Sequence, residues 1–141
     1  MAETRSEQAQ YRRHRSAVPG ARAKARTVAY CWDLPQIATS LEWVVTELVT
    51  NAIVHGRAAR GSRVVVTYHL ENDVLRVDVR DWASGSPHMA PSPASAGELP
   101  ETGRGIQVVA ALAVDWGVTL KVIGKSVWAE LAVTSPGGDH P

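Results

Sequence analysis

Residues 62–82, SRVVVTYHLENDVLRVDVRDW, constrain the fold of this chain most strongly. Their first run is rich in β-branched residues, and in the second run Leu75, Val77 and Val79 alternate with charged side chains. Alternation with a period of two is typical of a strand with one buried face. The short polar stretch 71–73 between the two runs predicts a turn, so that the strands form an antiparallel hairpin.

A second hairpin is predicted over residues 118–133, VTLKVIGKSVWAELAV, turning at Gly124 and Lys125. Three helices are expected besides, over residues 19–32, 36–55 and 103–117. Because the strands arrive in hairpin pairs and do not alternate with helices, a doubly wound parallel sheet is excluded. We expect an α/β two-layer sandwich, with one mixed, mostly antiparallel sheet and helices on one face.

Composition indicates a soluble globular protein with one domain. The chain has 141 residues, of which 45% are apolar and 21% charged, and this length is sufficient to bury a core. Cys31 is the only cysteine, so an internal disulfide is excluded. We find no apolar run near the ~20 residues of a membrane helix and no secretory signal at the polar N-terminus. We therefore expect a cytoplasmic protein.

Charge is distributed unevenly along the chain. Residues 1–26 carry seven Lys/Arg and two Glu, whereas the remainder has eight basic and twelve acidic residues. We interpret residues 1–18 as a flexible basic segment that is simply solvated. The alternative is that these cations bind nucleic acid or an acidic partner, but aromatic residues suited to base stacking are absent beyond Tyr11. We expect no direct binding to nucleic acid.

Two further segments have the composition of irregular structure. Residues 83–102 are rich in Pro, Ser, Ala and Gly and show no periodicity, which predicts a long loop. Loops of this length inside a small domain are usually functional or disordered. Residues 135–141 predict a disordered tail.

Polar side chains recur at steps of four in the second predicted helix, within TELVTNAIVHG. On a helical wheel of ~100° per residue, Asn51 lies about 40° and His55 about 80° from Glu47. Apolar residues of the same helix fill the arc from about 60° to 240°. Glu47 and Asn51 therefore border the buried stripe, where a core can meet a cavity. Taken alone, the two residues are equally compatible with solvent exposure and local hydrogen bonding.

Two more polar clusters follow the first hairpin. Asp81 ends the alternating strand and Gly85 follows four residues later. An aspartate at a strand end can accept hydrogen bonds from an exocyclic amine, although it is also common in ordinary turns. The segment ETGRGI begins the third helix with Gly103, Arg104 and Gly105. Glycines allow close backbone approach, and the free N–H groups at a helix N-terminus attract phosphate.

Other site patterns are excluded by the sequence. Residues 124–126, Gly-Lys-Ser, resemble the end of a phosphate-binding P-loop. However, Thr119 replaces the required first glycine, and a strand follows where a helix is needed. The five histidines and Cys31 show no metal-ligand spacing.

The ordered set ELVTNAIVHG, VRDWASG and GRGI resembles the Bergerat-type ATP-binding fold. That superfamily includes sensor histidine kinase catalytic domains, gyrase-type ATPases and anti-sigma-factor serine/threonine kinases. The resemblance is strongest to the last group, which is abundant in actinobacteria. It extends from about residue 21 to residue 133 and implies an ATP-binding domain over residues 19–134, with loop 83–102 containing the mobile ATP lid.

The resemblance also implies roles for individual residues. Asn51 matches the ligand of a Mg²⁺ ion that bridges the ATP phosphates. Glu47 matches the position of the general base, or of a residue that holds a metal-bound water. Asp81 matches the acceptor for the adenine amine, and Gly85 matches a glycine that makes room for the base. The segment that wraps the phosphates is matched by Gly103, Arg104 and Gly105.

The implied function is that of an ATP-binding regulator. It would bind Mg·ATP, phosphorylate an antagonist protein on serine and control a sigma factor. The partner would be a sigma factor, its antagonist or both. The oligomeric state is left open, with a homodimer as one alternative. The sequence departs from the family pattern at Ala83, where a glycine is frequent, and at Glu101, where some kinases of the group carry an arginine. The alternative is therefore a nucleotide-binding module that sequesters a partner without kinase turnover.

Overall fold

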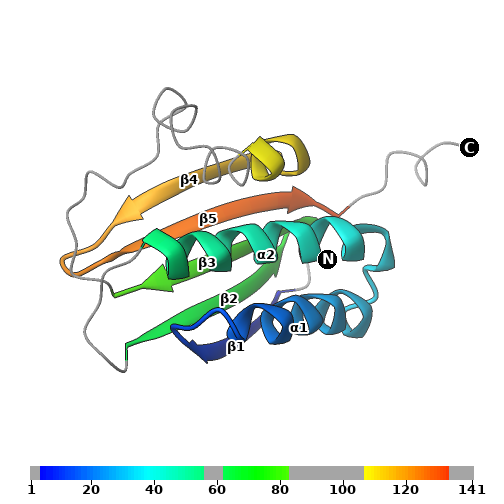
Figure 1. Ribbon diagram of the computed structural model, residues 1–141. Coiled ribbons are helices and arrows are strands. Elements are labelled where there is room, and N and C mark those ends of the chain that lie inside the picture. Colours follow the sequence, from blue (N-terminus) through cyan, green and yellow to red (C-terminus); the bar gives the residue numbers. More distant parts are fainter. Residues whose placement is uncertain (1–3, 56–61, 83–106, 134–141) are drawn as a thin grey trace, which may run out of the picture.

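The computed structural model describes residues 4–55, 62–82 and 107–133 (Figure 1). Helix α1 (Ala17–Cys31) is followed by a 3-10 helix (Pro35–Ile37) and by α2 (Ala38–His55). A short helical segment covers residues 107–112. The strands are β1 (Arg5–Arg12), β2 (Arg63–Glu71), β3 (Val74–Asp81), β4 (Asp115–Leu120) and β5 (Lys125–Ala132).

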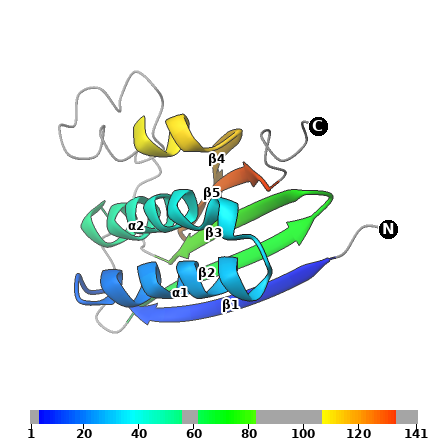
Figure 2. The same ribbon diagram turned by 90° about the vertical axis from the view of Figure 1, so that its right-hand side faces the viewer.

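The five strands form one sheet in the order β1-β2-β3-β5-β4, and all four pairings are antiparallel. Both views place α1 and α2 side by side on one face of this sheet, α1 over β1 and β2 and α2 over β3 and β5 (Figures 1 and 2). The predicted two-layer α/β sandwich is confirmed. Its sheet was expected to be mixed, but no parallel pair occurs among the strands that the structure describes.

The prediction of a flexible N-terminal segment over residues 1–18 is wrong for residues 5–12. These residues form β1, which pairs with β2 along its whole length, from Arg5 opposite Leu70 to Arg12 opposite Arg63. A polar edge strand gives little hydrophobic signal, because only one of its faces is even half buried. Its apolar residues are Ala9 and Tyr11, and only Tyr11 packs against the core.

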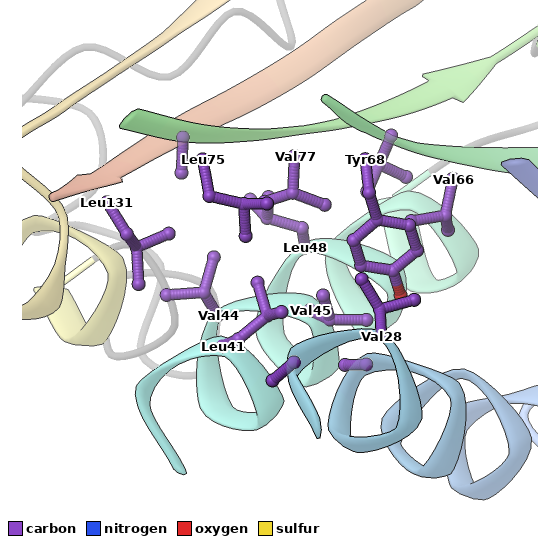
Figure 3. Close-up of a cluster of buried hydrophobic side chains, with 14 of the residues drawn as sticks. Val28, Leu41, Val44, Val45, Leu48, Val66, Tyr68, Leu75, Val77 and Leu131 are labelled. Atoms are coloured by element: carbon purple, nitrogen blue, oxygen red, sulfur yellow. The ribbon is translucent and has the colours of Figure 1, made fainter. Parts of the chain in front are cut away.

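The core lies between the sheet and the two helices. In Figure 3, Tyr68 and Val77 project from the sheet toward Val45 and Leu48 of α2. The predicted alternation of the first hairpin is confirmed, since Leu75, Val77 and Val79 are all buried. At 20–33 cal/mol per Å² of buried apolar surface, burial of such side chains is the main stabilising contribution to the fold.

Local signals explain where the main elements end. Asp33 has a φ of 61° and follows α1, while the N–H of Leu34 bonds the carbonyl of Ala29 at 2.7 Å. This is the bonding pattern of a left-handed helix cap, which releases the chain toward α2. Asn72 and Asp73, with φ of 55° and 62°, form the two-residue hairpin turn between β2 and β3.

The segment Pro35–Val54 is long and apolar enough to span a membrane by composition, contrary to the sequence expectation. In the fold its apolar residues Leu41, Val44, Val45, Leu48 and Val49 are buried. This is how the central helix of a small soluble α/β domain is built, with one face against a sheet and another helix beside it.

The third helix was predicted to end at residue 117, which is too late in the chain. Residues 107–112 are helical, but β4 begins at Asp115, where a helix was expected to continue to residue 117. Pairing with β5 determines the conformation of this segment, because Trp116 and Val118 lie opposite Ala129 and Val127. The second hairpin and its turn near Gly124 are confirmed.

Candidate functional site

Asp81 is a carboxylate on the buried side of the sheet, at the end of β3. Its position continues the alternation of Leu75, Val77 and Val79, so it faces the layer between sheet and helices. Lys125, the first residue of β5, lies directly opposite in the strand register. A charge in such a place is costly unless it is paired and hydrogen-bonded.

Two cations pair with Asp81. Arg13 donates through Nη2 to Oδ1 of Asp81, and Nζ of Lys125 lies 3.5 Å from Oδ2. The side chains of Arg13, Lys125 and Asp81 are only 10%, 9% and 2% exposed. These three residues, which we call the Asp81 cluster, form a nearly dry group with one more positive than negative charge.

Arg13 connects the Asp81 cluster to α2 and to the start of β2. Its Nη1 donates to the carbonyl of Ala52 at 2.5 Å, and its Nε donates to Oγ of Ser62 at 3.2 Å. Figure 1 shows the ends of β1, α2 and β3 and the start of β5 at the same side of the molecule. The residue before Ala52 is Asn51, so the Asp81 cluster lies near the polar end of α2.

Burial affects the ionisation of both cations in this cluster. Desolvation lowers the pKa of Arg13. Desolvation, and in second place repulsion from Arg13, lower the pKa of Lys125. Lys125 is the more readily neutralised of the two, because the ordinary pKa of lysine, 10.5, is below the 12.5 of arginine.

Gly124 brings the second hairpin against the backbone of Asp81. It has a φ of 78°, and a Cβ at this position would lie 1.9 Å from the carbonyl oxygen of Asp81 and 2.8 Å from Cα of Trp82. Only glycine combines this dihedral with this approach. The contact holds the start of β5, and with it Lys125, beside Asp81.

Glu47 and Asn51 lie one turn apart on α2, and both are half buried. The predicted position at the border of the buried stripe fits this burial, since Val44, Val45, Leu48 and Val49 between and before them are buried. Within the described ranges, neither polar side chain has a hydrogen-bond partner that would account for its place. Desolvation raises the pKa of the Glu47 carboxyl.

The chemistry of this edge of α2 fits a magnesium ion. A carboxylate and an amide oxygen are both hard oxygen ligands, and Mg²⁺ uses few protein ligands while keeping several waters. Groups of three or more His, Cys, Asp or Glu that could hold a metal are absent from the described part of the chain. A metal here would therefore depend on Asn51, on Glu47 and on oxygens from a ligand.

Several predicted site residues cannot be placed. Gly85, Gly103, Arg104, Gly105 and loop 83–102 lie outside the described residues, as does the side chain of His55. The sequence reasoning missed Arg13 and Lys125. Only the fold brings these two cations to Asp81, Lys125 through the pairing of β5 with β3 and Arg13 through the connection after β1.

Comparison with known families identifies one family for this chain. The family model described as the histidine kinase-like ATPase domain matches residues 12–130, which include every described element from α1 to β4 and most of β5. A search of curated proteins gives no match. The matched range contains Arg13, Glu47, Asn51, Asp81 and Lys125.

Proposed function

The chain belongs to the histidine kinase-like ATPase domain family, and on that premise we propose that it is an anti-sigma-factor-type serine/threonine kinase. It would bind Mg·ATP, phosphorylate an antagonist protein on serine and control a sigma factor. Nucleotide binding is what membership of the ATPase family implies. The regulatory partners, the metal and the kinase step are our proposal.

The observation that supports the proposal most directly is the buried carboxylate of Asp81. It lies in the family-matched range and is linked through Arg13 to the end of α2. A carboxylate in a site of low dielectric accepts hydrogen bonds strongly and in fixed directions. Asp81 would accept from the exocyclic amine of adenine, and Asn51 and Glu47 would face the phosphates.

Phosphoryl transfer would use Glu47 as the base. The serine hydroxyl gives its proton to Glu47, its oxygen bonds the γ-phosphorus, and the bond to the β–γ bridging oxygen breaks to release ADP. The raised pKa of Glu47 makes it a better proton acceptor near neutral pH. A magnesium ion held by Asn51 would neutralise charge on the phosphate oxygens.

Binding can be tested by calorimetry with Mg·ATP. We expect saturable binding that Asp81→Asn and Asn51→Ala each weaken by at least tenfold, because each removes a group that contacts the ligand. Asp78→Asn is a suitable control, since Asp78 lies on the same strand but on the opposite face. If the intact protein does not bind the nucleotide, the proposed function is wrong.

The kinase step needs a separate measurement. Labelled ATP is incubated with the protein and candidate antagonist proteins, which are recovered by co-purification from cytoplasmic extract of native cells. We expect label on serine of one partner, and at least a hundredfold loss with Glu47→Ala.

A second candidate function is a nucleotide-gated module that sequesters its partner without turnover. Glu101 favours it, because some kinases of the resembled group have an arginine at this position that can reach the γ-phosphate. If the partner binds but wild type and Glu47→Ala leave it equally unlabelled, this second function is correct. Sedimentation of the purified protein would show whether it acts as a homodimer.

A further inference from the structure

The Asp81 cluster is closed as it stands in the fold. Arg13 and Lys125 approach different oxygens of Asp81, and the carboxylate side chain is only 2% exposed. A ligand that hydrogen-bonds to Asp81 needs access to one of its oxygens. Arg13 bonds Oδ1, so a ligand that bonds this oxygen has to displace the guanidinium.

We propose that Arg13 competes with the nucleotide base for Asp81, so that the residue after β1 keeps the base site shut until the nucleotide displaces it. The inference rests on the proposed function, in which Asp81 accepts from the base. It goes further because it makes the N-terminal strand and its arginine a determinant of nucleotide affinity.

Of the two cations, Arg13 is the one that can withdraw. Lys125 is fixed by the pairing of β5 with β3, in which it lies directly opposite Asp81. Gly124 holds the preceding turn against the Asp81 backbone. Arg13 lies in the connection between β1 and α1, outside both elements. A rotation of its long side chain would remove its bond to Oδ1 of Asp81 without breaking a strand pairing.

Withdrawal of Arg13 would also be felt at the phosphate end of the site. The same guanidinium bonds the carbonyl of Ala52, next to Asn51, and Oγ of Ser62 at the start of β2. A base that displaces Arg13 therefore frees the end of α2 as well. Under this proposal, the base site at Asp81 and the end of α2 that carries Asn51 are connected through Arg13, which moves between a paired and a withdrawn position.

The size of the effect follows from the fraction of molecules that are open. If 1–10% of the protein has Arg13 withdrawn, the apparent affinity for nucleotide is reduced about 10- to 100-fold relative to a permanently open site. Replacing Arg13 by a side chain that cannot pair with Asp81 removes this penalty.

The test is calorimetric titration of the full chain with Mg·ATP. We expect Arg13→Gln to bind at least tenfold more tightly than wild type, and Arg13→Lys to be intermediate, since lysine retains the charge but not the three-way bonding. Arg12→Gln is the matched control, because Arg12 is the exposed neighbour at the end of β1, and its affinity should equal that of wild type.

The outcomes separate this inference from the proposed function. If wild type binds Mg·ATP and Arg13→Gln binds equally or more weakly, the competition is wrong while the nucleotide site stands. If no variant binds, both are wrong. Melting curves establish that each variant is folded.

A second readout needs no substitution. The ¹⁵Nε–H signal of Arg13 in the wild-type protein reports its bonds directly. It should shift on saturation with Mg·ATP, and an unchanged signal would overturn the inference even if Arg13→Gln fails to fold.

Discussion

At the scale of single residues, the position of Gly124 is determined by the backbone that it touches. Any side chain there would combine a left-handed dihedral with a clash against the Asp81 carbonyl. We expect Gly124→Ala to lower the free energy of unfolding by more than 2 kcal/mol, since the dihedral alone costs roughly 1–2 kcal/mol.

Gly20 provides the matched comparison for Gly124. It lies in α1, where an added Cβ would meet only Cε1 of Tyr11, at 4.0 Å. Gly20→Ala should therefore raise the free energy of unfolding by about 0.5–1 kcal/mol, through the lower conformational entropy of the unfolded chain. Urea denaturation of both variants checks the pair, and equal effects would contradict the assigned backbone geometry.

Tyr68 carries a hydroxyl that the core does not use. The side chain is fully buried, and Oη has no hydrogen-bond partner among the described residues. Removing an unsatisfied buried polar group removes its desolvation cost, so Tyr68→Phe should raise the free energy of unfolding by about 1 kcal/mol. Thermal melting measures this, and a destabilised variant would show that the hydroxyl is bonded.

Glu47 should make stability depend on pH. Its pKa in the folded protein is raised above the ordinary 4.5 by desolvation, so the folded state binds more protons than the unfolded state just above pH 4.5. Its contribution is therefore fully present below pH 4.5 and is lost as the pH rises through the folded pKa. Glu47→Gln should be more stable than wild type at pH 7, and this advantage should shrink toward pH 4. If wild type and Glu47→Gln have the same free energy of unfolding at pH 7 and at pH 4, Glu47 is not desolvated.

At the scale of elements, the strength of the hydrophobic signal decided what the sequence could predict. The alternation of β3 and the apolar stripe of α2 were sufficient, because each element buries a whole face. β1 could not be found, since Ala9 and Tyr11 are its only apolar residues and β2 supplies its pairing. β4 was missed in part for the same reason, because its start carries Asp115 and Gly117.

The same contrast holds for the candidate site. The positions of Asn51 and Glu47 beside the buried stripe of α2, and of Asp81 at the end of β3, could be predicted from the periods of a helix and a strand. Their roles at a nucleotide site were implied by the family resemblance and stay a prediction. Arg13 is separated from Asp81 by 68 residues, and no local pattern connects them. A contact made only by tertiary packing leaves no trace in a single sequence.

The packing of α2 on the sheet should carry much of the stability. Leu48 is fully buried, and Figure 3 shows it between α2 and the strands. Leu48→Ala should lower the free energy of unfolding by about 2–5 kcal/mol through the lost contacts and the cavity. Val54→Ala on the same helix is the control, since Val54 is 46% exposed and should change stability by less than about 0.5 kcal/mol. Chemical denaturation measures the free energy of unfolding of both variants. Similar losses for Leu48→Ala and Val54→Ala would contradict the packing of the Leu48 face of α2 against the sheet.

At the scale of the whole molecule, the strand order predicts a gradient of local stability. β2, β3 and β5 each have a strand on both sides, whereas β1 and β4 are the two edges. Both sides of β3 are bonded, and its inward residues are buried in the core, so its amides can exchange with solvent only when the domain unfolds. Edge strands can open separately, because opening them costs fewer buried contacts.

Hydrogen exchange at increasing urea concentration should resolve this gradient. We expect β3 amides to exchange with the free energy and urea dependence of global unfolding, and β1 and β4 amides to exchange with smaller values of both. β1 is the informative edge, because it leads into Arg13 and is also joined to α1 through Lys24 and Glu7. Protection of β1 equal to that of β3 would mean that the N-terminal strand cannot open independently. Any release of Asp81 would then have to come from the Arg13 side chain alone.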